Sequence, residues 1–213
     1  MKTLTLFLTS IFLLSGMLSA QQTDKELTKE LKDKAIKEAR KEAKSLEKVD
    51  WQAYEGALPL PMILENAWKK QMVVDDKGDP VYITADGNGV AETKSVAEMQ
   101  ALELAKLQLA GMIQSNISSL VSANIGNTQL SQEDAVSVTE IVQSSKNLIA
   151  TELGYVNPYF KIYRMLENKR VEVQVRIFYD TKQSLEIARK VVRGEIKDKL
   201  KVNEEQLNKL MGM

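Results

Sequence analysis

The sequence contains no cysteine and no histidine. Without cysteine the protein forms no disulfide, so its stability is expected to come from an ordinary hydrophobic core. The two absences together exclude the Ser–His and Cys–His pairs of nucleophilic catalysis. They also exclude zinc and copper sites of the usual type, whose ligands include cysteine and histidine.

An excess of charge of either sign is also lacking. The chain has 29 basic and 29 acidic residues, whereas a nucleic-acid-binding protein typically carries a basic excess. Beyond the amino terminus, no apolar stretch reaches the roughly 20 residues that are needed to cross a bilayer. We therefore expect no nucleic-acid partner and no transmembrane segment in the mature chain.

Residues 1–20 have the pattern of a secretory signal peptide. Lys2 supplies a positive charge, and an apolar run follows from Leu4 to Leu14 that is too short to span a bilayer. Ala20 ends a plausible cleavage site, and a buried amino-terminal helix is the alternative. Gln21 then stands where a lipid-anchored bacterial lipoprotein requires cysteine. The sequence thus predicts an exported protein, periplasmic or secreted, and soluble after cleavage following Ala20.

Residues 21–50 are predicted to form a charged helical extension. Residues 24–48 contain neither glycine nor proline, and oppositely charged pairs such as Glu30 and Lys34 stand four positions apart. Apolar residues also recur mostly every four positions, a spacing that fits a coiled-coil seam poorly. These residues are Leu27, Leu31, Ala35, Ala39, Ala43 and Leu46. Two interpretations follow: a solvated or loosely docked helix, or a helix that binds a specific partner.

Residues 51–80 are predicted to be a connector that contains one short helix. Pro59 and Pro61 interrupt regular structure, residues 62–73 favour the helix, and residues 75–80 have the composition of a turn. The aromatic residues of this segment are expected to anchor it to the core, and an exposed aromatic binding face is the alternative. They include Trp51, Tyr54 and Trp68.

Residues 81–182 are predicted to form the core domain. Apolar and polar residues alternate over 81–86, which indicates a half-buried strand, and Gly87 and Gly89 are expected to turn the chain after it. Ser95 and Glu98 have the spacing of a capping box at the start of a long helix that ends near residue 123. The residues expected to face inward are Met99, Leu102, Ala105, Leu109, Ile113 and Leu120.

The second half of the core domain predicts a helix and then a β-hairpin. Ser131 and Asp134 mark the start of the helix, and its β-branched residues leave open a strand at its end. Asn168 and Lys169 lie between two runs of alternating polarity, which is typical of a hairpin turn.

Residues 183–213 are predicted to form carboxy-terminal helices. Asp180 and Gln183 have the spacing of a helix cap, and Asn203 and Gln206 repeat the pattern before a tail that is expected to fray. The order of the elements predicts an α+β fold, with helices packed on one face of a small antiparallel sheet.

No motif supplies a complete chemical site. A dinucleotide-binding loop that begins at Gly87 would need glycine or alanine at its sixth position, where this chain has Glu92. Ser45 and Lys48 match the S-x-x-K pattern of serine hydrolases but lie on a charged helix without apolar surroundings. The acidic run at 75–79 lacks the ligand spacing of a calcium loop. We predict no catalytic, cofactor-binding or metal-binding residues.

Two segments carry a family resemblance. YITADGNGVAETKSVAEMQALELAKLQLAGMI, followed later by VNPYFKIYRMLENKRVEVQVRIFYD, resembles the twenty-kilodalton LPP-type bacterial envelope lipoproteins. The same module is similar to the amino-terminal domain of the flagellar assembly protein T. The resemblance covers about residues 80–182 and implies an α+β fold and residence in the bacterial envelope. It implies no cofactor and no catalytic residues, and this chain lacks the lipidated cysteine of the family.

Taken together, these features predict a non-enzymatic, exported envelope protein that binds other proteins or a surface polymer. Two alternatives stay open. One is a hydrolase of envelope glycans that uses two of the 29 carboxylates as a pair. The other is a module that binds a small molecule in a pocket between the long helix and the sheet.

Overall fold

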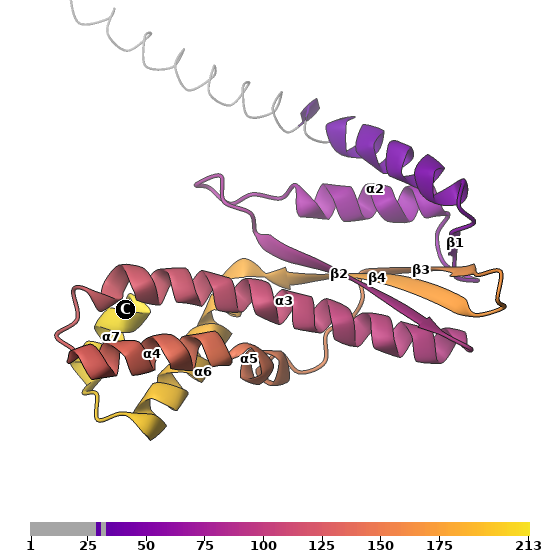
Figure 1. Cartoon of the computed structure of the whole chain (residues 1–213). Coiled ribbons are helices and arrows are strands. Elements are labelled where there is room, and N and C mark those ends of the chain that lie inside the picture. Colours follow the sequence, from indigo (N-terminus) through magenta and orange to yellow (C-terminus); the bar gives the residue numbers. More distant parts are fainter. Residues whose placement is uncertain (1–28, 31–32) are drawn as a thin grey trace, which may run out of the picture.

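The computed structural model describes residues 29–30 and 33–213 and shows a four-stranded antiparallel sheet with helices packed against it (Figure 1). The strands lie in the order β1 (Gln52–Ala53), β3 (Phe160–Met165), β4 (Val171–Asp180) and β2 (Tyr82–Ala91). The helices are α2 (Leu60–Gln71), α3 (Lys94–Ile125), α4 (Gln132–Ser144), α5 (Lys146–Glu152), α6 (Thr181–Lys199) and α7 (Glu204–Met211), and residues 33–47 are also helical. The predicted α+β fold with an antiparallel sheet is confirmed.

The predicted leader at 1–20, the predicted cleavage site at Ala20, and Leu27 and Leu31 of the predicted extension lie outside the described residues. Within the part of the chain that the structure describes, no helix is both long enough and apolar enough to cross a membrane.

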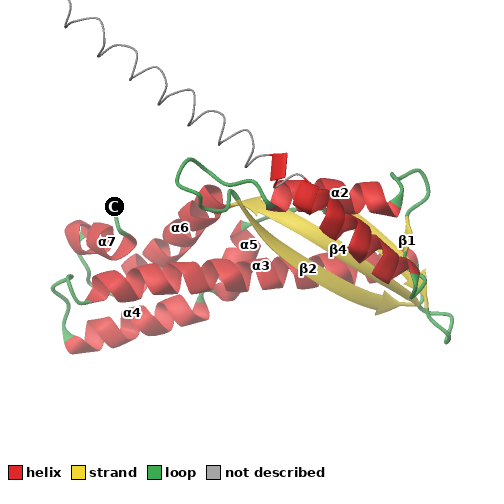
Figure 2. Cartoon of the chain, turned by 90° about the horizontal axis from the view of Figure 1, so that it is seen from above, coloured by secondary structure: helices red, strands yellow, loops and turns green. Residues whose placement is uncertain are grey.

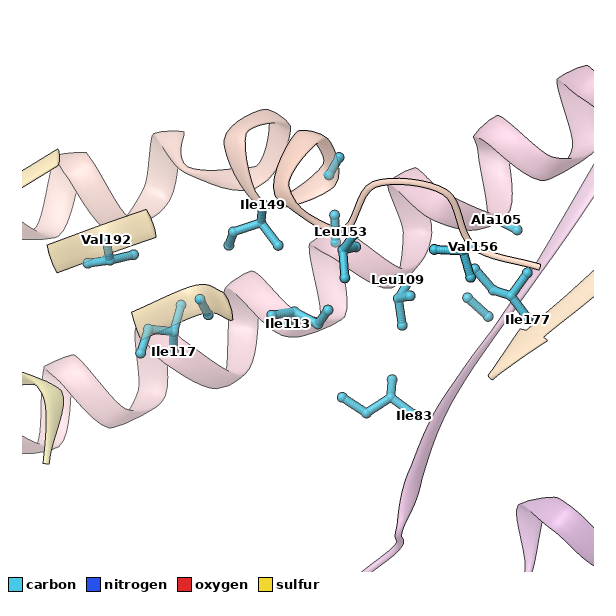
Figure 3. Close-up of a cluster of buried hydrophobic side chains, with 14 of the residues drawn as sticks. Ile83, Ala105, Leu109, Ile113, Ile117, Ile149, Leu153, Val156, Ile177 and Val192 are labelled. Carbon is cyan, nitrogen blue, oxygen red and sulfur yellow. The ribbon is translucent and has the colours of Figure 1, made fainter. Parts of the chain in front are cut away.

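One face of the sheet packs on α3 and forms the larger hydrophobic core. Strands β2 and β4 pair along their whole length, from Tyr82 opposite Asp180 to Ala91 opposite Val171, and their alternate residues point to α3. Figure 3 shows Leu109 and Ile113 of α3 between Ile83 of the sheet and side chains of α5. The fully buried residues of this core include Ala105, Leu109, Ile113, Ile117, Ile149, Val173, Val175, Ile177 and Val192.

Gly87 and Gly89 are not turn residues, because β2 continues through both and ends at Ala91. Each faces α3 at very close range: a Cβ atom at Gly87 would lie 2.0 Å from the carbonyl oxygen of Ala101, and one at Gly89 would lie 2.1 Å from that of Ala97. The prediction of a turn was therefore wrong. Glycine is needed here for a close approach between strand and helix, not for a change of chain direction.

The start and the inner face of α3 also differ from the prediction. Thr93 caps the helix, with its hydroxyl accepting a hydrogen bond from the Val96 amide at 3.4 Å, where the sequence indicated Ser95. Met99 was expected to face inward but is 61% exposed. The alanines at 97 and 101 face the sheet instead, because the strand glycines admit only small residues on the opposing helix.

Helices also cover the second face of the sheet, whereas the sequence predicted helices on one face only (Figures 1 and 2). Strand β3 directs Phe160 and Ile162 away from α3, where they meet residues 33–47 and α2. Ala39 and Ala43 of the predicted extension are at most 1% exposed. The second core comprises Ala39, Ala43, Trp51, Leu60, Leu64, Ala67, Phe160 and Ile162. The described part of the extension is thus packed on the sheet and is not a solvated arm.

The connector and the hairpin follow the prediction. Helix α2 buries Leu64 and Ala67 as expected, and Val74 and Pro80 form an isolated antiparallel bridge across the 75–80 turn. In the β3–β4 hairpin, Asn168 accepts a hydrogen bond from the Arg170 amide at 3.1 Å, and Lys169 has a φ of 63°.

The carboxy-terminal half of α3 packs against α4, α6 and α7. The predicted caps are present, since the side chains of Ser131, Asp180 and Asn203 each accept a hydrogen bond from a backbone amide of the first turn. The segment after α4 is helix α5, not a strand. The predicted frayed tail is also wrong, because α7 is ordered and buries Leu207 and Leu210 completely.

Candidate functional site

The sequence motifs weighed for chemistry do not converge on one site. The exposed hydroxyl of Ser45 donates to the carbonyl oxygen of Lys41 at 3.0 Å, as a surface serine on a helix commonly does. Asp75 accepts hydrogen bonds from the amides of Lys77 at 2.9 Å and Asp79 at 3.1 Å, which lower its pKa and close the turn. Among residues 29–30 and 33–213, no three acidic side chains gather as a metal site would require.

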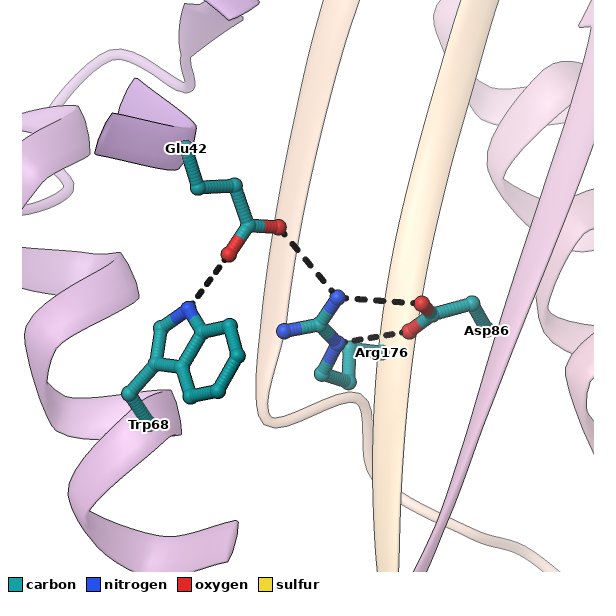
Figure 4. Close-up of polar contacts among 4 residues, drawn as sticks. All are labelled: Glu42, Trp68, Asp86 and Arg176. Atoms are coloured by element: carbon teal, nitrogen blue, oxygen red, sulfur yellow. Dashed lines mark hydrogen bonds and ion pairs between the residues drawn. The ribbon is translucent and has the colours of Figure 1, made fainter. Parts of the chain in front are cut away.

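A buried arginine connects the sheet to the helical residues 33–47 (Figure 4). Arg176 of β4 lies directly opposite Asp86 of β2 and donates to its carboxylate through Nε at 2.7 Å and Nη2 at 3.0 Å. The same Nη2 reaches Glu42 at 3.4 Å, and Glu42 accepts a hydrogen bond from the indole of Trp68 at 2.5 Å. Burial lowers the pKa of Arg176, but the hydrogen bonds and charges of Asp86 and Glu42 outweigh it, and the net pKa is raised.

This network bears on the hydrolase alternative. Asp86 and Glu42 are a pair of carboxylates that the fold brings together, but a single guanidinium lies between them and binds both. A glycosidase places its two carboxyl groups on either side of an open substrate cleft. The arrangement around Arg176 therefore holds a helix on the sheet and offers no position for a sugar ring.

The small-molecule alternative placed a pocket between the long helix and the sheet. At Gly87 and Gly89 the backbones of β2 and α3 are too close to accommodate even a methyl group. Around these two glycines the interface is filled by protein and leaves no space for a ligand.

Three aromatic rings surround the ammonium group of Lys70, near the end of α2. Its Nζ lies 4.6 Å from the ring centroid of Tyr82, 4.7 Å from that of Tyr159 and 5.4 Å from that of Phe178. The Tyr159 and Phe178 rings meet edge to face at 4.9 Å. Such cation–π contacts fix the end of α2 to the sheet. A surface hollow of about 400 Å³ adjoins them, between Lys70 and the segment 155–159.

A second polar and aromatic cluster lies at the opposite edge of the sheet. The Tyr54 hydroxyl is buried and has no hydrogen-bond partner among the described groups. Burial raises its pKa, and the negative charge of Glu98 adds to the effect. Lys161 pairs with Glu98 at 2.7 Å and lies 4.7 Å from the Tyr54 ring centroid. These contacts attach the segment after β1 to the start of α3, in line with the predicted anchoring role of Tyr54.

The outer side of the helix at 33–47 forms the most distinctive exposed surface. Four of its exposed residues, called here the basic face, are Lys37, Arg40, Lys41 and Lys44, and together with Asp33 and Ile36 they line one surface hollow. All four cations are exposed, and none takes part in an ion pair between described residues. The opposite side of the helix carries the buried residues Ala35, Ala39 and Ala43.

Sequence reasoning identified neither Arg176 nor the basic face. In the sequence, Arg176 is one of the polar residues of a strand in which apolar and polar residues alternate. Only the register of β2 and β4 places it opposite Asp86. The basic face does have a sequence signal, because its residues stand at i, i+3, i+4 and i+7, on the side opposite Ala35, Ala39 and Ala43. This spacing indicates an exposed basic surface only once the alanines are known to be buried.

Comparison with known proteins finds no matching family model, no matching curated protein and no matching solved structure. The resemblance to LPP-type envelope lipoproteins therefore stays a prediction from the sequence.

Proposed function

We propose that this chain is an exported protein of the bacterial envelope that works by binding and not by catalysis. The proposal rests on the leader-like residues 1–20, on the absence of histidine and cysteine, and on the resemblance of residues 80–182 to envelope lipoproteins. Its partner is an anionic component of the envelope, bound at the basic face.

The observation that carries this proposal is the fixed orientation of the helix at 33–47. Ala39 and Ala43 pack on the sheet, and Glu42 accepts hydrogen bonds from Trp68 and Arg176. A helix held on one side presents its other side permanently. Four cations on that side, with Asp33 as the one acidic group among the described residues of the hollow, form a local positive surface on a chain whose formal net charge is zero.

A positive surface of this kind favours negatively charged partners and accelerates their association. Exposed lysines contribute little to the stability of the fold, so their placement on the outer side is not required by packing. The basic face thus supplies a binding function without any need for a pocket or a reacting group.

Export is tested by cell fractionation of the native organism, with mass spectrometry of the amino terminus. The expected result is a mature chain that begins at Gln21 in the envelope or outside the cell. Recovery of the full chain from the cytoplasm would contradict the proposal.

Binding is tested by affinity capture from fragmented envelope that has not been solubilised, comparing the exported protein with the triple variant K37E/K41E/K44E. Substitution is preferable to deletion of residues up to Val49, because deletion would uncover Phe160 and Ile162 and leave Arg176 without Glu42. The captured material is expected to be anionic and to disappear with the triple variant. Equal capture by both proteins would rule out the basic face as the binding surface.

A further inference from the structure

We propose that the partner of the basic face is the anionic headgroup surface of a phospholipid bilayer, on which the protein docks reversibly. This inference rests on the proposed function above and names the partner of the same surface. It follows from the shape of the basic face, from the way the helix is already packed, and from its charge.

The shape of the basic face suits an extended surface. Lys37, Lys41 and Lys44 recur at i, i+4 and i+7, so they follow one line along the helix, and Arg40 lies beside it. At a rise of 1.5 Å per residue, this line is about 10 Å long. The exposed outer side of a helix lets all four cations meet a broad layer of phosphates at once.

The packing of the helix determines the mode of contact. Amphipathic helices that lie in a membrane insert an apolar face below the headgroups. Here the apolar side, with Ala39 and Ala43, is already buried in the second core, and Ile36 is the partly buried apolar residue among the cations. Within residues 33–47 the helix therefore has no apolar face free for insertion, and the contact proposed for these residues is electrostatic and peripheral.

The charge of the basic face determines the expected strength of membrane binding. Among the described residues that line the hollow, the four cations and Asp33 give a net charge of three positive units. Each basic residue near an anionic bilayer contributes about a fivefold gain in partition, so three units give roughly a hundredfold preference for anionic over neutral membranes. Screening shortens the reach of these charges from about 10 Å at 0.1 M salt to about 3 Å at 1 M, so binding should be lost at high salt.

The test is co-sedimentation of the exported protein, without its leader, with two kinds of vesicle: phosphatidylcholine alone, and phosphatidylcholine with phosphatidylglycerol. Each is measured at about 0.1 M and about 1 M salt. A parallel arm measures binding to soluble polyglutamate, a polyanion without a surface. The variants are K37E/K41E/K44E and the matched control K77E/K169E/K201E, which changes the net charge equally at three exposed lysines elsewhere.

The expected result is binding to the phosphatidylglycerol vesicles at low salt only, lost in K37E/K41E/K44E and retained in the control. Binding to polyglutamate but not to vesicles would overturn the membrane inference and leave the proposed anionic partner standing. Binding to neither would overturn both. Equal loss in the two variants would show that net charge, and not the basic face, drives association, which also contradicts the inference. Thermal unfolding of both variants checks that each is folded.

Discussion

Gly87 of β2 lies against the backbone of α3, where a Cβ atom would come within 2.0 Å of the carbonyl oxygen of Ala101 and 2.5 Å of the amide nitrogen of Ala105. A β-carbon cannot approach backbone atoms this closely, so any larger residue must separate the strand from the helix. The contact joins α3 to the edge strand β2 and keeps the larger core closed.

Gly87→Ala should therefore destabilise the protein strongly. Overpacking commonly costs about 1–3 kcal/mol, and a clash with backbone belongs at the upper end of that range. Gly194→Ala is the control, because Gly194 lies inside α6 with no neighbour within 4 Å of a new Cβ atom. This change should stabilise the protein by up to about 1 kcal/mol. Urea unfolding measures both, and a neutral Gly87→Ala would refute the close-contact explanation.

Arg176→Ala should be among the most destabilising single changes on the second face of the sheet. It leaves Asp86, whose side chain is 41% exposed, and Glu42, whose side chain is 24% exposed, without their shared cation. Removing one member of a fully buried ion pair costs about 3–5 kcal/mol, and the partial exposure of both carboxylates reduces the expected loss to about 2–3 kcal/mol. Lys199→Ala breaks only an exposed i,i+4 pair with Glu195 and should cost about 0.5 kcal/mol or less. Similar losses in the two variants, measured by thermal unfolding, would contradict this account.

Lys70→Met tests the cation–π contacts at the end of α2. Methionine keeps much of the aliphatic stem but removes the charge that faces Tyr82, Tyr159 and Phe178, with an expected loss of about 1–2 kcal/mol. The neighbouring Lys69→Met breaks an exposed pair with Glu65 and should cost at most about 0.5 kcal/mol. If Lys70→Arg retains the wild-type stability while Lys70→Met does not, the charge is responsible. Equal stability of all three variants would exclude the contacts as a stabilising element.

The 75–80 turn should lose stability in acid. Amide hydrogen bonds from Lys77 and Asp79 lower the pKa of Asp75 below its ordinary value of 3.8. A carboxyl group whose pKa is lowered on folding stabilises the folded form above its unfolded pKa, and this stabilisation is lost as the pH falls through the lower, folded pKa. NMR should show the Lys77 and Asp79 amides titrating together with a midpoint below 3.8. Asp75→Asn keeps an acceptor but removes this titrating group, so the Lys77 and Asp79 amides should then no longer share that midpoint. A midpoint at or above 3.8 would contradict the prediction.

Much of the fold was accessible from sequence because its signals are local. The caps at Ser131, Asp180 and Asn203 and the hairpin at Asn168 depend on neighbouring residues, and all are present. Predictions from the sequence were wrong where a residue type can serve in two structural roles. Gly87 serves equally well in a turn or in a close contact, and only the position of α3 distinguishes the two.

The basic face, too, could be predicted from the sequence only in part. The spacing of Lys37, Lys41 and Lys44 is visible in the sequence. Which side of the helix is exposed, however, depends on which side packs against the rest of the protein. The structure supplies that cover through Phe160 and Ile162 of β3, and Glu42 holds the orientation through Arg176.

The sequence by itself determined the absence of histidine and cysteine chemistry, the leader-like amino terminus, and most helix starts, because composition and capping depend on residues close together in the chain. Tertiary structure alone decided that the helix at 33–47 is docked, that Arg176 meets Asp86, and that Gly87 faces Ala101. Each of these contacts joins residues far apart in sequence, and burial and register depend on which surfaces meet.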